Sequence, residues 1–188
     1  MTANGTAAPL ASATIIRRVI TTPIGPLTLA AGPAGVRAVL WPGEDGTRAW
    51  RAVADAVDEA DAPEGAEVRA ARAHLDRAQA ELAEYFDGCR RTFDVALDPA
   101  GTPFQLQVWE VLRTIPYGST MSYGEQAAAL GDPRKARAVG AANGRNPLSI
   151  LVPCHRVVAT SGALTGFAGG VDTKAWLLEH ERAVLAAG

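Results

Sequence analysis

Residues 122–142 read SYGEQAAALGDPRKARAVGAA and predict two short helices joined by a tight turn. Ser122 and Glu125 have the spacing of a capping box, which opens a helix that ends at Gly131. Asp132 then opens a second helix at once, with a proline at its first position. Helices joined in this way form a helix-turn-helix unit. Such a unit is either a DNA-binding element or a plain structural pair of helices.

The second helix of this unit favours DNA binding. One of its faces repeats at i, i+3, i+4 and i+7 and carries two arginines on a bed of alanines: Arg134, Arg137, Ala138 and Ala141. Alanines permit a close approach to a DNA groove, whereas large side chains would hold the helix away. Val139 lies on the opposite face, toward the core.

A thiol and an imidazole lie side by side further along, in Pro153-Cys154-His155-Arg156-Val157 after the apolar run 150–152. A free cysteine is only about 3 % thiolate at pH 7. A nearby imidazole and positive charge lower the pKa of a thiol, so Cys154 is a candidate nucleophile at the end of a buried strand-like segment. Most free cysteines are small buried hydrophobes, and for an isolated Cys-His pair that alternative stays open.

The rest of the chain separates into a strand-rich part and a helical part. Alternation and turn residues predict strands over 14–22, 27–31, 36–41 and 92–97, with a short helix over 49–60 and a longer one over 67–86. Thr102 caps a further helix. The predicted organisation is a disordered tail (1–13), an N-terminal α/β domain (14–98), a linker (99–102) and a C-terminal helix-turn-helix domain (103–188).

Charge is distributed unevenly along the 188 residues, whose 48 % apolar content is enough to fill a core. The net charge is −2, but residues 113–156 carry 6 basic and 2 acidic side chains. This modest basic face coincides with the helix-turn-helix, so it fits a polyanionic partner bound with a shallow dependence on salt.

The two cysteines, Cys89 and Cys154, lie far apart without CxxC spacing, which indicates neither a disulfide framework nor a zinc site. Cys89 reads as structural. A Cys89–Cys154 bridge remains an alternative that would consume the nucleophile. Residues 1–13 lack the features of a signal peptide, and no stretch is long and apolar enough to span a bilayer. We therefore expect a cytoplasmic protein without a membrane partner. A reduced thiol survives in that compartment.

Three spaced motifs agree in order and separation with one known family: Arg137-Ala138-Val139-Gly140, Asn143-Gly144-Arg145-Asn146-Pro147 and Pro153-Cys154-His155-Arg156-Val157. They resemble the active-site region of the O6-alkylguanine-DNA alkyltransferases, the methylated-DNA–protein-cysteine methyltransferases. The resemblance runs from about Thr102 to Arg182 and is weaker before that. It implies an α/β (α+β) fold, with a small ribonuclease-H-like N-terminal domain around a mainly antiparallel sheet and a helical, winged-helix-like C-terminal domain.

The function that the resemblance implies is direct-reversal DNA repair. Cys154 would take an alkyl group from O6-alkylguanine, and from O4-alkylthymine as well, in duplex DNA. The expected partner is double-stranded DNA containing O6-alkylguanine, bound by a chain that is a monomer when free. No cofactor is called for. Because the product is a thioether without an easy leaving group, each molecule would act once.

The family's catalytic residues match five positions here. His155 would accept the Cys154 proton, and Glu181 would orient the imidazole. Tyr123 matches a tyrosine whose hydroxyl donates to the base, and Asn146 matches an asparagine that braces the turn beneath the thiol. The ordinary alternatives are a core tyrosine for Tyr123 and an exposed terminal charge for Glu181.

Other family positions concern DNA and the base pocket. Arg137 matches the finger that fills the base stack when the lesion is turned out, with its helix in the minor groove. The basic residues expected at phosphates are Arg134, Lys135 and Arg145, for which a solvated charged face is the alternative. The resemblance assigns the base pocket to Val157, Phe167 and Ala168.

Two departures from the family lie in that pocket. Many members have tyrosine in place of Phe167 and some have serine in place of Ala168, so two hydroxyl donors are absent here. The N-terminal half also lacks the cysteines and histidines of members that bind zinc, so no metal is expected.

Three rival functions remain. A non-catalytic protein that binds alkyl lesions would lack the cysteine, so Cys154 opposes that interpretation. A helix-turn-helix regulator would need sequence-reading polar side chains where this helix has alanines. A cysteine hydrolase built on Cys154 and His155 would turn over repeatedly.

Overall fold

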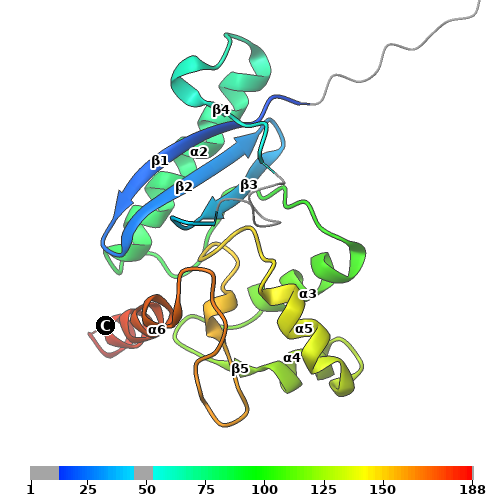
Figure 1. The fold of residues 1–188 in the computed structure, drawn as a ribbon. Helices are drawn as coiled ribbons and strands as arrows, with labels where there is room; N and C mark the ends of the chain where they lie inside the picture. Colours follow the sequence, from blue (N-terminus) through cyan, green and yellow to red (C-terminus); the bar gives the residue numbers. More distant parts are fainter. Residues whose placement is uncertain (1–12, 45–52, 188) are drawn as a thin grey trace, which may run out of the picture.

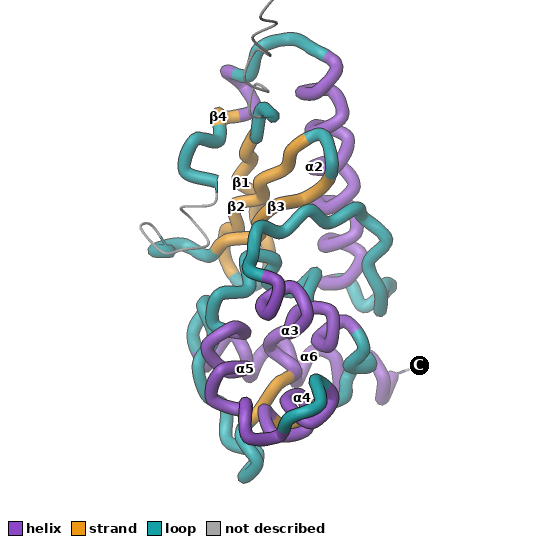
Figure 2. Tube along the Cα trace, turned by 90° about the vertical axis from the view of Figure 1, so that its right-hand side faces the viewer, coloured by secondary structure: helices purple, strands orange, loops and turns teal. Residues whose placement is uncertain are grey.

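The structure is a computed structural model that describes residues 13–44 and 53–187. The predicted tail of residues 1–13 therefore lies almost wholly outside the described residues, and so does the first part of the predicted helix over 49–60. The described residues form a layer of sheet and helix above a group of shorter helices (Figures 1 and 2).

A four-stranded sheet forms the first half of the fold. Its strands are β1 (Ile16–Thr22), β2 (Gly25–Gly32), β3 (Gly35–Leu40) and β4 (Val57–Asp58), in the order β3-β2-β1-β4. β1, β2 and β3 form an antiparallel meander, and β4 pairs with β1 in parallel. The turn between β1 and β2 needs the positive φ of 102° that Gly25 adopts.

Helix α2 (Ala66–Phe86) covers one face of the sheet (Figure 1). Its inward residues follow a spacing of three and four: Val68, Ala71, Leu75, Ala78, Leu82 and Tyr85. This spacing keeps one stripe of the helix against the sheet. Tyr85, at the last inward position, is fully buried.

The second half contains α3 (Pro103–Arg113), α4 (Tyr123–Ala129), α5 (Ala136–Asn143) and α6 (Val171–Ala187), with the short parallel strands β5 (Met121–Ser122) and β6 (Val157–Val158). The predicted capping box of Ser122 and Glu125 is present, and Thr102 forms another with Gln105. A 3-10 turn, η2 (Pro133–Lys135), precedes α5, and the Asp132 side chain accepts from the Arg134 amide. The predicted helix-turn-helix is therefore confirmed.

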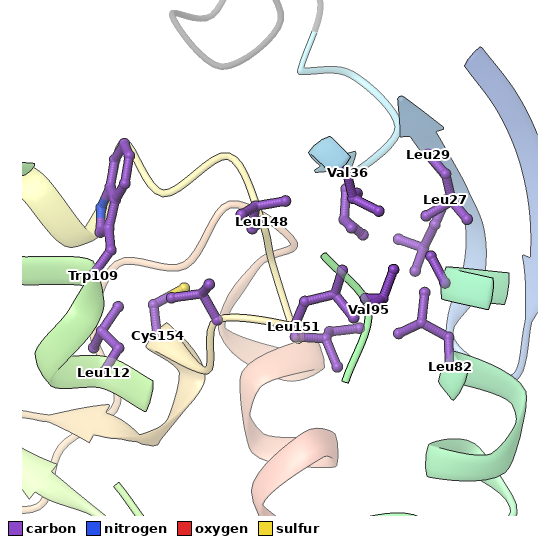
Figure 3. Packing of buried hydrophobic residues seen from close by; sticks show 14 of the residues in the cluster. Leu27, Leu29, Val36, Leu82, Val95, Trp109, Leu112, Leu148, Leu151 and Cys154 are labelled. Atoms are coloured by element: carbon purple, nitrogen blue, oxygen red, sulfur yellow. The ribbon is translucent and has the colours of Figure 1, made fainter. Parts of the chain in front are cut away.

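One apolar core runs through both halves. Figure 3 shows it passing from Leu27 and Leu82, beside the sheet, through Val95 and Leu151 to Cys154. The outer edge of β3 also joins the halves, because the Val39 amide donates to the Pro147 carbonyl at 2.7 Å. The sheet thus supports the turn that leads to Cys154. The division into domains at residues 99–102 stays a prediction.

The predicted class, a mixed α/β fold with a mainly antiparallel sheet and a helical C-terminal part, is confirmed. Two local predictions are wrong. Residues 92–97 form an isolated bridge at Leu97 in place of a strand, because the Glu81 carboxylate accepts the amides of Asp94 and Val95 at 2.8 and 3.2 Å. Within the predicted helix over 49–60, residues 53–58 form a turn and β4, and only residues 59–60 are helical, in the 3-10 turn η1 (Glu59–Asp61).

Cys89 is exposed, and both cysteines are free, so the alternative Cys89–Cys154 bridge is not formed. In the ranges 13–44 and 53–187, no helix combines the length and the apolar character that a membrane span requires.

We expect Leu112→Ala to lower the free energy of unfolding by about 2–5 kcal/mol, because Leu112 is fully buried on α3 and its loss leaves a cavity. Leu106→Ala removes the same atoms from the same helix at a position that is 39 % exposed. It should change the free energy of unfolding by no more than about 0.5 kcal/mol. Urea denaturation of both variants measures the difference. Equal losses would show that α3 does not pack as described.

Candidate active site

Cys154 begins the 3-10 turn η3 (Cys154–Arg156), directly after a tight turn over residues 146–153. Asn146 holds that turn from within: its Nδ2 donates to the Val152 carbonyl at 2.8 Å, and its Oδ1 accepts from the Leu148 amide at 3.0 Å. Ile150 adopts a positive φ of 73°, which is uncommon for a branched residue and marks local strain. The run 150–152 is therefore a braced turn and not the strand-like segment that was predicted.

Cys154 is 9 % exposed as a residue, and its side chain lies at the end of the apolar core (Figure 3). Burial raises the pKa of this thiol, while a side-chain hydrogen bond from Asn146 and the positive charge of Lys174 act in the opposite direction. The resting sulfur is therefore protonated and needs a base before it can act as a nucleophile.

His155 directly follows Cys154 in this turn. Its ring is fully buried, and Nε2 lies 2.8 Å from Oε1 of Glu181. Burial lowers the pKa of His155 against the opposing pull of Glu181, so the imidazole is neutral. Nε2 then carries the proton donated to the carboxylate. Nδ1 is buried and has no hydrogen-bond partner among the described residues, which leaves it as an acceptor.

Glu181, on α6, accepts hydrogen bonds from three parts of the chain besides His155. Arg156 approaches with Nη2 at 2.9 Å from Oε1 and Nε at 3.0 Å from Oε2, the Gly118 amide donates to Oε2 at 2.8 Å, and the Tyr85 hydroxyl donates to Oε1 at 3.0 Å. Burial acts to raise the pKa of Glu181, but the hydrogen bonds and charges of its partners lower it to about 2. The carboxylate is ionised.

Lys174 is a further buried charge that the sequence reasoning missed. It is fully buried on α6, and its Nζ donates to the carbonyls of Val157 at 2.5 Å and Thr165 at 2.9 Å. Burial lowers its pKa. A signal was available, because Lys174 and Glu181 lie seven residues apart and so share the helix face of Leu177. Arg156, also missed, directly follows His155 in the motif.

The predicted pocket residues lie around the loop 165–170. Val157 is buried, Phe167 is half-buried and Ala168 is exposed. The Phe167 ring is 5.5 Å from that of Trp41 and 6.4 Å from that of His155. The Tyr123 hydroxyl lies 3.5 Å from the Thr165 carbonyl. Tyr123 and Phe167 thus belong to one neighbourhood, and Trp41, beyond the end of β3, is a supporting residue that the sequence did not reveal.

The basic face forms a second surface, separate from the buried turn. Arg137, Ala138 and Ala141 are exposed on α5, and Lys135 and Arg145 are exposed at its two ends. The Arg134 side chain is 90 % exposed, with its Nε 2.9 Å from Asp132 Oδ1. Within the described part of the chain, no group of three or more His, Cys, Asp or Glu residues is placed to hold a metal ion.

A family model described as "6-O-methylguanine DNA methyltransferase, DNA binding domain" matches residues 103–183. A methylated-DNA–protein-cysteine methyltransferase of Salmonella typhimurium is 59 % identical over 103 residues, which cover 54 % of this chain and 60 % of the relative. The Mycobacterium tuberculosis protein of the same name is 57 % identical over 102 residues, 54 % of this chain and 62 % of that relative. The matched segments thus span about three fifths of these relatives' length.

Solved structures extend the likeness to nearly the whole chain. The Mycobacterium tuberculosis O6-methylguanine methyltransferase is 42 % identical, with a TM-score of 0.75 over 90 % of this chain and 94 % of its own. The Mycobacterium tuberculosis OGT in complex with DNA is also 42 % identical, with a TM-score of 0.75 over 89 % and 93 % of the two chains. Both halves of the fold, and not only the helix-turn-helix, are therefore similar to these proteins.

Glu181→Gln should lower the free energy of unfolding at pH 7 by about 3–5 kcal/mol, because it leaves the buried Arg156 charge without its partner. The folded pKa of Glu181 lies below its unfolded value, so the carboxylate stabilises the fold fully above about pH 4.5 and loses this effect as the pH falls toward about 2. Urea titrations should therefore show that the difference in free energy of unfolding between wild type and variant becomes smaller as the pH falls from about 4.5 toward about 2. Glu179→Gln, with a side chain that is 76 % exposed on the same helix, is the control. A gap that stays constant with pH would contradict the ionised state of Glu181.

Proposed function

Because this chain belongs to the methylated-DNA–protein-cysteine methyltransferase family, we propose that it repairs DNA by moving an alkyl group from O6 of guanine to the sulfur of Cys154. The observation that carries the proposal is a buried arrangement of three groups. Cys154 and His155 are neighbours in η3, and Nε2 of His155 donates to the ionised carboxylate of Glu181 on α6 at 2.8 Å, while Nδ1 has no hydrogen-bond partner among the described residues. The same chemistry applies to the O4-alkyl group of thymine, which is also bonded to an exocyclic ring oxygen.

Transfer requires the thiol to lose its proton. Nδ1 of His155 accepts it, directly or through one water, and the resulting imidazolium is stabilised by Glu181. The sulfur then attacks the alkyl carbon, a carbon–sulfur bond forms and the carbon–oxygen bond breaks. Guanine leaves with the electron pair of that bond, and the Tyr123 hydroxyl donates to the ring as charge develops. The thioether has no easy leaving group, so each molecule acts once.

The lesion must leave the base stack before the sulfur can reach it, which costs a few kcal/mol. Exposed Arg137 would fill the vacated space, where stacking contributes about 1–3 kcal/mol. Exposed Ala138 and Ala141 allow α5 to lie close to the floor of the minor groove. Phosphate contacts would come from the exposed basic side chains around α5: Arg134, Lys135 and Arg145.

The extruded base would enter the neighbourhood of Val157, Phe167 and Ala168. Asn146 would support this site from below by holding the turn that ends at Cys154. The free protein is proposed to be a monomer that needs no cofactor.

Mixing the protein with duplex DNA that contains O6-methylguanine should increase its intact mass by one methyl group, mapped to Cys154, with no more than one lesion repaired per molecule. Cys89→Ser should behave like wild type, since Cys89 is exposed and lies outside the site. Cys154→Ser should gain no mass. An unchanged mass for the wild type would favour the non-catalytic lesion binder, and repair in molar excess would favour a hydrolase.

Arg137→Ala should slow repair of the lesion in duplex DNA by about tenfold or more, because one stacking interaction is lost. Transfer from the free base O6-benzylguanine should change far less, since that substrate needs no extrusion. Single-turnover rates on both substrates measure the two effects. Arg69→Ala, on the exposed side of α2, removes an equal charge away from the site and is the control. Equal losses on both substrates would exclude the finger role.

A further inference from the structure

Tyr85 places a hydroxyl group from the first half of the chain at the centre of the site. It is the last inward residue of α2, and its side chain is fully buried. Its hydroxyl donates to Oε1 of Glu181 at 3.0 Å. The same oxygen accepts from Nε2 of His155 at 2.8 Å. The guanidinium of Arg156 also donates to this oxygen at 2.9 Å, so one carboxylate oxygen joins Tyr85 to two residues of η3 that lie far from it in sequence.

Packing explains the ring of Tyr85 but not its hydroxyl. The ring lies 5.4 Å from that of Phe86, 5.6 Å from that of Phe93 and 5.9 Å from that of Tyr117, so phenylalanine would fill the same space. A buried hydroxyl needs a hydrogen-bond partner. The partner of the Tyr85 hydroxyl is the carboxylate of Glu181, which also accepts from His155. Burial raises the pKa of Tyr85, so its oxygen keeps the proton and remains a donor.

We propose that Tyr85 is a positioning residue of the Cys154–His155–Glu181 relay, and that its hydroxyl fixes the place and the charge of the oxygen that His155 contacts. This inference rests on the proposed alkyl transfer. A hydrogen bond donated to a carboxylate withdraws charge from it, so it weakens the attraction of Oε1 for the imidazolium. Tyr85 thereby keeps His155 neutral and able to accept the Cys154 proton. The first half of the chain thus takes part in setting the reactivity of a thiol in the second half.

Other ionisable groups face the relay and remain unchanged when Tyr85 is replaced. They come from four segments packed around it: Cys154 and Arg156 in η3, Lys174 and His180 on α6, Tyr117 in the loop before β5, and Glu44 after β3. A shift that follows the loss of the Tyr85 hydroxyl is therefore measured against a constant set of neighbours.

The test is the pH dependence of the single-turnover transfer rate for Tyr85→Phe, with O6-benzylguanine as substrate. In the wild type the rate falls in acid as His155 becomes protonated. Without the Tyr85 hydroxyl, Oε1 carries more charge and stabilises the imidazolium, so this acid limb should move to higher pH by about half a unit to one unit. A limb that coincides with that of the wild type would overturn the inference.

Tyr117→Phe is the matched control. It removes one hydroxyl from the same aromatic group, and the Tyr117 hydroxyl is buried without a hydrogen-bond partner among the described residues. Its acid limb should coincide with that of the wild type. Equal shifts in the two variants would assign the effect to general packing and reject a specific role for Tyr85.

Two further measurements keep the inference separable from the proposed function and from loss of folding. In a Cys89→Ser background, the pH dependence of Cys154 alkylation by iodoacetamide, followed by mass, reports the same relay without DNA or guanine. Tyr85→Phe should shift this profile as well, even if the wild type accepts no alkyl group from DNA. If Tyr85→Phe does not fold, 3-fluorotyrosine at position 85 is a stronger donor and should move the limb to lower pH, whereas no movement would reject the inference.

Discussion

The buried carboxylate of Glu181 is the constraint on which the site depends. An ionised group without partners in the interior costs several kcal/mol, so its partners are obligatory. The fold brings them from separate places: His155 and Arg156 from η3, the Gly118 amide from the loop before β5, and Tyr85 from α2. Satisfying one charge therefore fixes the positions of these segments relative to one another, and with them the position of the thiol.

A second constraint acts on the turn that leads to that thiol. Asn146 satisfies polar backbone groups on both sides of the turn, and the Pro147 carbonyl is bound by the edge of β3. Ile150 adopts its strained backbone angle within this frame. Such strain persists only where the surroundings over-determine the conformation. The sheet is therefore part of the support of the site, although it contributes no nucleophile, base or carboxylate.

The parts of the site that could be predicted from the sequence are those encoded locally. Ser122 and Glu125 cap a helix through residues three apart, and helix phase alone turns Glu181 toward the core. Tyr85 could not be found in this way, since its spacing on α2 is that of any packing residue, and only the tertiary structure brings it to Glu181. The strand predicted over residues 92–97 is wrong for a related reason. Their alternation predicts backbone hydrogen bonds to a neighbouring strand, whereas the Asp94 amide donates to the side chain of Glu81, which lies on another element.

The two cysteines lie in contrasting environments, and the proposed transfer assigns the reaction to the buried one. Cys89 is exposed, whereas Cys154 lies among apolar side chains that hold it in the thiol form. Burial would make Cys154 inert if it acted alone, because it penalises the thiolate. A hydrogen bond from Asn146 and the positive charge of Lys174 act against that penalty without overcoming it, and in the proposed transfer His155 supplies the base. In the proposed reaction the product is an uncharged thioether, so the apolar surroundings that resist the thiolate would accommodate the alkylated sulfur.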